Sequence, residues 1–180
     1  MYFGRTALRF ASGPETRLTC HNHLSFMSQE DRDRPGEAGR GLDSGTERRG
    51  GRLGSDTTTR GIRVQVTSSY VPDKSSPREG TYLFTYHVRI SNVGGETAQL
   101  ISREWIITNA DGEVERVKGP GVVGEQPVLP PGGGFEYTSF CPLKTAVGSM
   151  QGSYQMVTGD GERFDALIAP FTLAVPNALN

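Results

Sequence analysis

Hydrophobic and polar residues alternate along much of the chain after residue 60, and this alternation is typical of strands that bury one face. The clearest case is Tyr82–Ser91, in which every second residue is aromatic or aliphatic and the residues between them are mostly polar. Residues 62–67 show the same alternation, and Thr97–Thr108 is rich in β-branched and aromatic residues. Because side chains of a strand alternate between its two faces, these segments predict half-buried β-strands.

Turn-forming residues separate these segments from further strand-like ones. Asn109–Gly112 predicts a tight turn before a returning strand at 113–118, and Gly159–Gly161 predicts a second tight connection. Further strands are expected at 135–140, 149–158, 162–168 and 171–175. No segment sustains the helical period beyond two turns. About seven or eight short strands predict an all-β fold, an antiparallel β-sandwich of the immunoglobulin or fibronectin type III kind without a disulfide inside the domain.

The composition of the chain changes near Arg60. Between Ser28 and Arg60 the hydrophobic residues are only Ala38, Leu42 and Leu53. Such a stretch buries too little apolar surface to offset the entropy lost on ordering. We therefore expect residues 1–60 to be a low-complexity, largely disordered and dispensable extension, and residues 61–180 to be the domain.

The first 27 residues lack the apolar core of a secretory signal. Their arginine-rich, acid-poor composition keeps an organellar presequence as an alternative to the favoured interpretation, an upstream extension without function or with a wrongly assigned start. His21 and His23 have no third ligand at a suitable spacing, so no metal site is predicted there.

Charge and hydropathy exclude several classes of partner. The formal net charge is -1, which gives no overall attraction to nucleic acid or to anionic lipid. No apolar run approaches the roughly 18–20 residues of a membrane helix. Cys20 and Cys141 are the two cysteines and cannot form a dense disulfide framework. The sequence therefore predicts a soluble, cytoplasmic protein that binds neither nucleic acid nor membrane.

A glycine-rich loop carries the strongest candidate site. Gly119, Gly121 and Gly124 satisfy the G-x-G-x-x-G spacing of dinucleotide-binding folds. That site also needs a helix beginning in the loop, and the prolines that follow exclude a regular helix; they are Pro127, Pro130 and Pro131. A Walker loop is excluded as well, because Glu125 and Gln126 stand where Lys and Ser or Thr would be needed.

Two interpretations of this loop remain open. Its backbone amides could form an anion-binding nest, with Lys118 and Arg116 as counter-charges and Glu125 opposing the anion. The favoured interpretation is structural: the glycines supply positive φ angles, while Val122 and Val123 fix the loop to the core.

Candidates for catalysis are few. His87 is the single histidine after residue 60, so any Ser-His-Asp or Cys-His arrangement would need it; its predicted place on the polar face of a strand does not favour such an arrangement. Cys141 fits a buried thiol better than a nucleophile, and Trp105 fits a core position better than a binding platform. Three acidic residues are more consistent with a solvated hairpin than with a metal cluster; they are Asp160, Glu162 and Asp165. No catalytic residue, metal site or cofactor is predicted.

Five ordered blocks of the domain resemble those of the ApaG family. They are Trp105–Asn109, Gly121–Pro127, Tyr137–Ser139, Gly148–Met156 and Phe171–Pro176. The resemblance covers residues 61–180 and implies a fibronectin type III-like sandwich, in agreement with the strand pattern. It also implies a small bacterial protein with a genetic link to cobalt resistance and magnesium efflux and no established enzymatic activity.

Related ApaG domains in eukaryotic F-box proteins and in a protein that interacts with a DNA polymerase imply protein interaction as the role. The proposed pyrophosphate loop of the family falls on Gly119, Gly121 and Gly124. Residues 1–60 contain no F-box pattern and inherit nothing from the resemblance. The favoured function is a non-enzymatic module for an unidentified protein partner. The alternative is that this loop, with Lys118, binds a nucleotide or pyrophosphate weakly. In its enzymatic form, the protein would be a phosphohydrolase that cleaves a dinucleotide at this loop.

Overall fold

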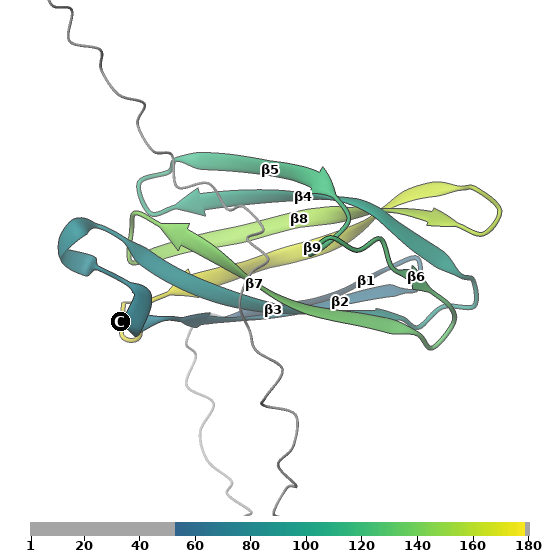
Figure 1. The fold of residues 1–180 in the computed structure, drawn as a ribbon, viewed down its shortest axis with the longest axis horizontal. Helices are drawn as coiled ribbons and strands as arrows, with labels where there is room; N and C mark the ends of the chain where they lie inside the picture. Colours follow the sequence, from purple (N-terminus) through teal and green to yellow (C-terminus); the bar gives the residue numbers. More distant parts are fainter. Residues whose placement is uncertain (1–52, 179–180) are drawn as a thin grey trace, which may run out of the picture.

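The computed structural model describes residues 53–178, which form two antiparallel sheets packed face to face (Figure 1). The first sheet has the order β1 (Gly54–Thr59), β2 (Ile62–Tyr70), β3 (Tyr82–Asn92) and β7 (Gly134–Leu143). The second has the order β5 (Val114–Pro120), β4 (Ala98–Asn109), β8 (Val147–Thr158) and β9 (Arg163–Ala174), and β6 (Val128–Leu129) pairs with β4. Two 3-10 turns, η1 (Pro72–Lys74) and η2 (Pro77–Glu79), join β2 to β3. The predicted all-β sandwich is confirmed.

The alternation in the sequence produces the core. In β3, Phe84, Tyr86, Val88 and Ile90 are buried, and the residues that alternate with them face solvent or lie half-buried. Full burial of a side chain of this size contributes about 1.5–3 kcal/mol. Trp105 packs edge-on against three aromatic rings from the two sheets, those of Tyr86, Tyr154 and Phe171. The distances between ring centroids are 5.3 to 6.3 Å. Trp105 is 3% exposed, which confirms its predicted core position.

Both predicted tight connections are present. The side-chain oxygen of Asn109 accepts hydrogen bonds from the backbone amides of Asp111 and Glu113 at 3.0 and 2.9 Å, and Gly112 has a φ of 81°. This Asx-type turn reverses the chain between β4 and β5. Gly159–Gly161 joins β8 to β9, and Gly161 has a φ of 90°.

Two sequence predictions need correction. The predicted disorder of residues 28–60 is wrong for Gly54–Thr59, which forms β1 and pairs with β2 along its whole length; residues 28–52 lie outside the described residues. The segments 162–168 and 171–175 form one strand, β9, with an irregularity in pairing between Ile168 and Phe171. β1 escaped prediction because its order comes from the ladder with β2 and from β-branched threonines rather than from apolar burial.

The two lateral sides of the sandwich differ. On the side that we call the closed side, β9 packs against β1 and β2, and the backbone amide of Leu167 donates to the hydroxyl of Thr59 at 3.2 Å. The hydroxyl of Ser68 contacts the carbonyl oxygens of Leu53 and Thr172 at 2.8 and 2.7 Å, next to both the start of β1 and the end of β9. On the opposite side, the open side, β5 and β7 each have a described strand on one edge only.

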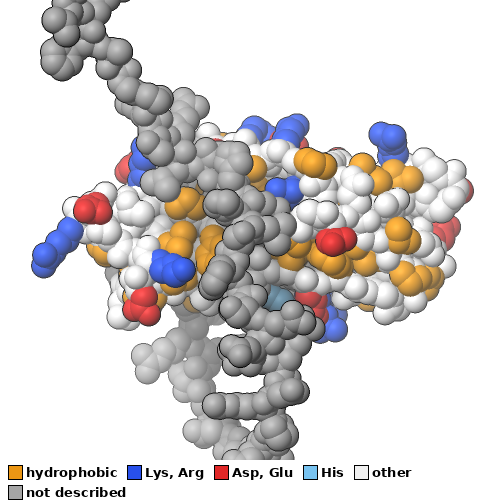
Figure 2. All heavy atoms as spheres, in the orientation of Figure 1, with side chains coloured by type: hydrophobic (Ala, Val, Ile, Leu, Met, Phe, Trp, Pro, Cys, Tyr) orange, Lys and Arg blue, Asp and Glu red, His pale blue; other side chains and the backbone are white. Residues whose placement is uncertain are grey.

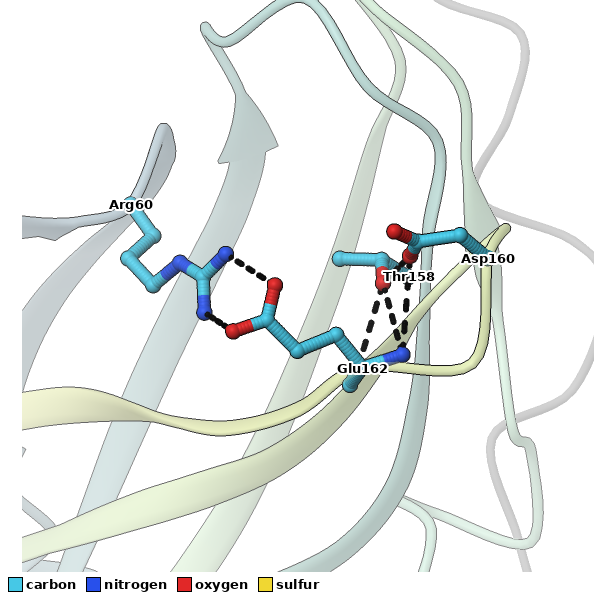
Figure 3. A network of polar contacts seen from close by, with 4 residues as sticks. All are labelled: Arg60, Thr158, Asp160 and Glu162. Carbon is cyan, nitrogen blue, oxygen red and sulfur yellow. Dashed lines mark hydrogen bonds and ion pairs between the residues drawn. The ribbon is translucent and has the colours of Figure 1, made fainter.

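A charged clasp also joins the two hairpins of the closed side (Figure 3). The guanidinium of Arg60 donates to both carboxylate oxygens of Glu162 at 2.6 and 2.7 Å and lies 4.9 Å from the ring centroid of Phe164. The hydrogen bond from Arg60 lowers the pKa of the Glu162 carboxyl. The hydroxyl of Thr158 donates to Asp160 and accepts from the Glu162 amide, which fixes the shape of the β8–β9 turn.

Candidate functional site

The predicted glycine loop folds into a tight turn that uses its own amides. The Gly121 amide donates to the Ile101 carbonyl at 2.8 Å. Val122 and Glu125 exchange two backbone hydrogen bonds of 2.8 Å, and Val122 is fully buried. Three amides of the predicted nest are therefore already engaged within the protein.

Each glycine of the motif meets a different steric demand. At Gly119 a Cβ would lie 3.2 Å from the guanidinium of Arg103, which crosses this position and donates to the Pro120 and Gly121 carbonyls. At Gly121 the φ is 52°, and a Cβ would lie 2.1 Å from the Glu125 carbonyl oxygen. Gly124 has a φ of 83°. These geometries support the structural interpretation of the loop.

The predicted counter-charges turn toward a carboxylate instead. Lys118 and Arg116 lie 3.2 and 3.1 Å from the Glu104 carboxylate on the outer face of the second sheet. The hydrogen bond from Lys118, followed in importance by that from Arg116, lowers the pKa of Glu104 against the opposing effect of desolvation. The structure thus places Lys118 next to Gly119 along β5, but with its charge compensated. Anion binding at the loop stays a prediction.

The other candidate residues are dispersed. Cys141 is fully buried, whereas His87 lies on the outer face of β3, with Nδ1 3.2 Å from the Thr138 hydroxyl and Nε2 3.6 Å from Glu136. Asp160 and Glu162 belong to the closed-side clasp. Within residues 53–178, no group of His, Cys, Asp or Glu side chains is arranged to hold a metal ion. Nor does this part of the chain contain a helix with the length and hydropathy of a membrane span.

The free edge of β7 offers backbone hydrogen-bonding groups to the open side. The Asn92 amide donates to the Gly133 carbonyl at 2.8 Å, which makes Ser91 and Gly134 a non-hydrogen-bonded pair. Pro142 agrees with this assignment, because it has no N–H and occupies a position whose N–H would not bond to β3. The even-numbered residues between 134 and 142 therefore direct their N–H and C=O groups, or for Pro142 only its C=O, away from β3 and toward the open side.

The free edge of β5 follows from the same reasoning. Gly121 donates to Ile101 at 2.8 Å and Asn109 donates to Glu113 at 3.1 Å, one residue beyond either end of the β4–β5 ladder. Val114, Arg116 and Lys118 therefore direct their backbone groups away from β4. Two strands, one from each sheet, thus present hydrogen-bonding edges to the same side of the molecule.

A groove of about 590 Å³ lies between these strands at one end of the open side. Ile107 and Leu143 supply apolar surface, Val114–Arg116 form one wall and Pro142–Lys144 belong to the other. Val114 is 58% exposed. Figure 2 shows further patches of hydrophobic side chains on this face. The partly buried hydrophobic residues on or near β5 and β7 are Val117, Val123 and Phe135. The open side therefore combines apolar surface with unused backbone groups.

Sequence reasoning missed this groove, although a signal was present. Pro120 and Pro142 each lie within a segment that forms a strand. Because proline cannot donate to an inner ladder, a proline in a strand indicates an edge. The two prolines marked β5 and β7 as edge strands.

Comparisons with known proteins agree with this architecture. The sequence-family model of the ApaG domain matches residues 72–158 of this chain. Protein ApaG from Anaeromyxobacter dehalogenans (strain 2CP-1) is 58% identical over 126 residues, which cover 70% of this chain and 99% of that protein. Protein ApaG from Thiobacillus denitrificans is 55% identical over 119 residues, or 66% of this chain and 94% of that protein. The crystal structure of an ApaA protein from Bordetella pertussis is 50% identical, with a TM-score of 0.64 over 65% of this chain and 95% of that one.

Proposed function

Because the chain belongs to the ApaG family, we propose that it is a non-enzymatic binding module that holds a protein partner on its open side. One observation carries this proposal: a groove lined by both apolar and charged residues lies between two strand edges that have no described neighbour. Hydrophobic surface and directional backbone groups are what protein interfaces commonly combine. The closed side offers no comparable combination within the described residues, since its edges pack against each other.

The positions of the candidate catalytic groups support a binding role over an enzymatic one. The Cys141 thiol is inside the sandwich, whereas the His87 imidazole is on an outer face, so the two cannot serve one substrate. We further propose a cytoplasmic location. The link to cobalt resistance and magnesium efflux that the family resemblance implies would act through the bound partner.

Site-specific photo-crosslinking tests this proposal. A photoreactive phenylalanine analogue replaces Val114 in the groove or, as the matched control, Leu167 on β9; the two native side chains are 58% and 55% exposed. In cells we expect a discrete crosslinked protein from position 114 and none from position 167. Equal crosslinking at both positions, or crosslinking from 167 alone, would contradict the assignment of the open side.

The alternative function, nucleotide or pyrophosphate binding at the glycine loop, has less support from the geometry. Its amides and its two cations already have partners within the protein. Calorimetry with pyrophosphate, nucleoside triphosphates and diadenosine polyphosphates separates the two functions. A pyrophosphate dissociation constant in the low micromolar range that is lost in Lys118→Ala would favour the alternative; we expect no affinity tighter than roughly millimolar.

A further inference from the structure

We propose that the partner binds as an extended segment that adds to the free edge of β7 as a fifth strand of the first sheet, with a Lys or Arg facing Glu115. This inference rests on the proposed function and specifies its chemistry. In this mode the main-chain hydrogen bonds supply affinity, and alternate side chains supply specificity.

The backbone of β7 is suited to strand addition over seven residues. Glu136, Thr138 and Phe140 each direct one N–H and one C=O toward the open side, as the pairing with β3 requires. Proline is absent from Gly134–Phe140. The ladder is limited at its far end by Pro142, which offers a carbonyl but no amide.

The inward face of β7 also permits a neighbour. The side chains that point toward the other sheet between residues 135 and 141 are uncharged; they are Phe135, Tyr137, Ser139 and Cys141. In β5, by contrast, Glu115 pairs with the buried Ile107 and therefore lies on the inward face of an edge strand. An inward charge is a device that blocks edge pairing, and β5 carries one in Glu115, whereas both strands have a proline near their ends. Strand addition is therefore assigned to β7 and not to β5.

The wall formed by β5 determines which side chains the partner presents. Inward residues of an added strand point toward the second sheet, where Glu115 lines the groove and Val117 lies half-buried two positions along. Among residues 53–178, Glu115 has no cationic partner, whereas the neighbouring Arg116 and Lys118 pair with Glu104. Lys144 belongs to the opposite wall. Charge complementarity therefore favours a basic residue against Glu115 and an apolar residue two positions away, against Val117.

The outward row of the added strand meets a second apolar contact. Phe140 is 49% exposed on the outer face of β7, and half-buried Leu83 and Pro142 lie on the same face nearby. An aliphatic or aromatic partner residue beside Phe140 would cover this surface. The expected partner segment thus has two inward residues, a basic one against Glu115 and an apolar one against Val117. It also has an apolar outward residue beside Phe140.

The probe for this proposal is a phage-displayed library of random twelve-residue peptides, selected on the full chain. We expect enrichment of peptides that follow this pattern. The synthetic form of the most enriched peptide is then methylated at single backbone nitrogens along its length. Because only alternate amides of an added strand face β7, binding should fall about tenfold or more at every second position and little at the others. This readout does not depend on the folding of a protein variant.

Variants of the protein complete the test. Thr138→Pro removes one free-edge amide and should weaken the peptide about tenfold or more, whereas Thr138→Ala, which keeps the amide, should leave affinity within about twofold. Glu115→Lys should weaken a peptide that carries a basic residue at the inward position, and exchange of that residue for Glu should restore binding. Asp111→Lys, in the β4–β5 turn, is the charge-matched control and should change affinity little.

Several results would overturn the proposal. Absence of enrichment, no alternation in the methylation series, or unchanged binding in Thr138→Pro would exclude strand addition, while the crosslink at position 114 could still support the proposed function. A dimer detected by sedimentation that Thr138→Pro dissociates would assign this edge to a second copy. A peptide affinity that rises sharply when residues 1–52 are deleted would assign it to that segment of the chain.

Discussion

The closed and open sides of the sandwich use the same type of edge strand in opposite ways. On the closed side, the polar groups of both sheets bond to each other, through Arg60 with Glu162 and through the Ser68 hydroxyl with two strand ends. On the open side, β5 and β7 keep their outer backbone groups without a described strand partner, and partly buried valines lie between them. Polar bonds between the sheets on the closed side therefore accompany, on the open side, backbone N–H and C=O groups that have no described strand partner. The difference places stabilising contacts on the closed side and, if the proposed function holds, recognition on the open side.

The largest effect is expected from Trp105, which connects the two sheets. Trp105→Ala should lower the free energy of unfolding by about 3–5 kcal/mol, because it removes a buried indole from an aromatic cluster that includes Phe171 of the closed side. Its cross-strand partner on the open side, Val117, is only half-buried, and Val117→Ala should cost about 1 kcal/mol. Urea titration measures both. Equal losses would contradict the contrast between the sides.

Removal of β1 should open the closed side. A chain that begins at Gly61 loses the six paired residues of β1 and the clasp of Arg60, and we expect it to lose about 3 kcal/mol or more. At this size that is a fall in melting temperature of roughly 10 °C. A chain that begins at Leu53 keeps β1 and is the control, for which we predict an unchanged melting temperature. A stable Gly61 chain would show that the closed side contributes little.

The loop at the end of β5 should respond at an intermediate level. Gly121→Ala places a Cβ 2.1 Å from the Glu125 carbonyl oxygen at a φ of 52°, so we expect a loss of about 2 kcal/mol. A Cβ added at Gly95 would meet no other described residue within 4 Å, so Gly95→Ala is the control, with an expected change below about 0.5 kcal/mol. Thermal unfolding with and without pyrophosphate measures both. A loss that pyrophosphate reverses would favour the ligand interpretation of the loop.

The smallest effect is expected from acid titration of the clasp. Because Arg60 lowers the folded-state pKa of Glu162, this carboxylate stabilises the fold above its ordinary pKa of 4.5, and the stabilisation is lost as the pH falls through the lowered value. Glu162→Gln should therefore be less stable than the native chain at pH 6, and the difference should shrink by pH 3. Glu79→Gln, on the exposed turn η2, is the control. A difference that does not depend on pH would show that the carboxylate charge is not what matters.

Sequence reasoning could predict the strands whose order depends on burial and not the features that depend on distant neighbours. The alternation in Tyr82–Ser91 and the Asn109 turn are local signals, and the structure confirms both. The clasp joins residues 102 positions apart, and the use of the loop amides depends on Ile101. The prolines of β5 and β7 mark each as an edge strand, but they do not indicate that the two edges flank one groove. Such features follow from topology, which a period of two does not specify.

The contact of Ser68 with both Leu53 and Thr172 has a consequence for the architecture of longer chains. It brings the start of the first strand and the end of the last one together, on the edge opposite the groove. Domains with adjacent ends tolerate circular permutation and insertion into other proteins. Both ends of the described domain lie on the closed side, away from the β5–β7 side. The fold can therefore be transplanted as a unit, with the surface proposed for recognition presented to the outside.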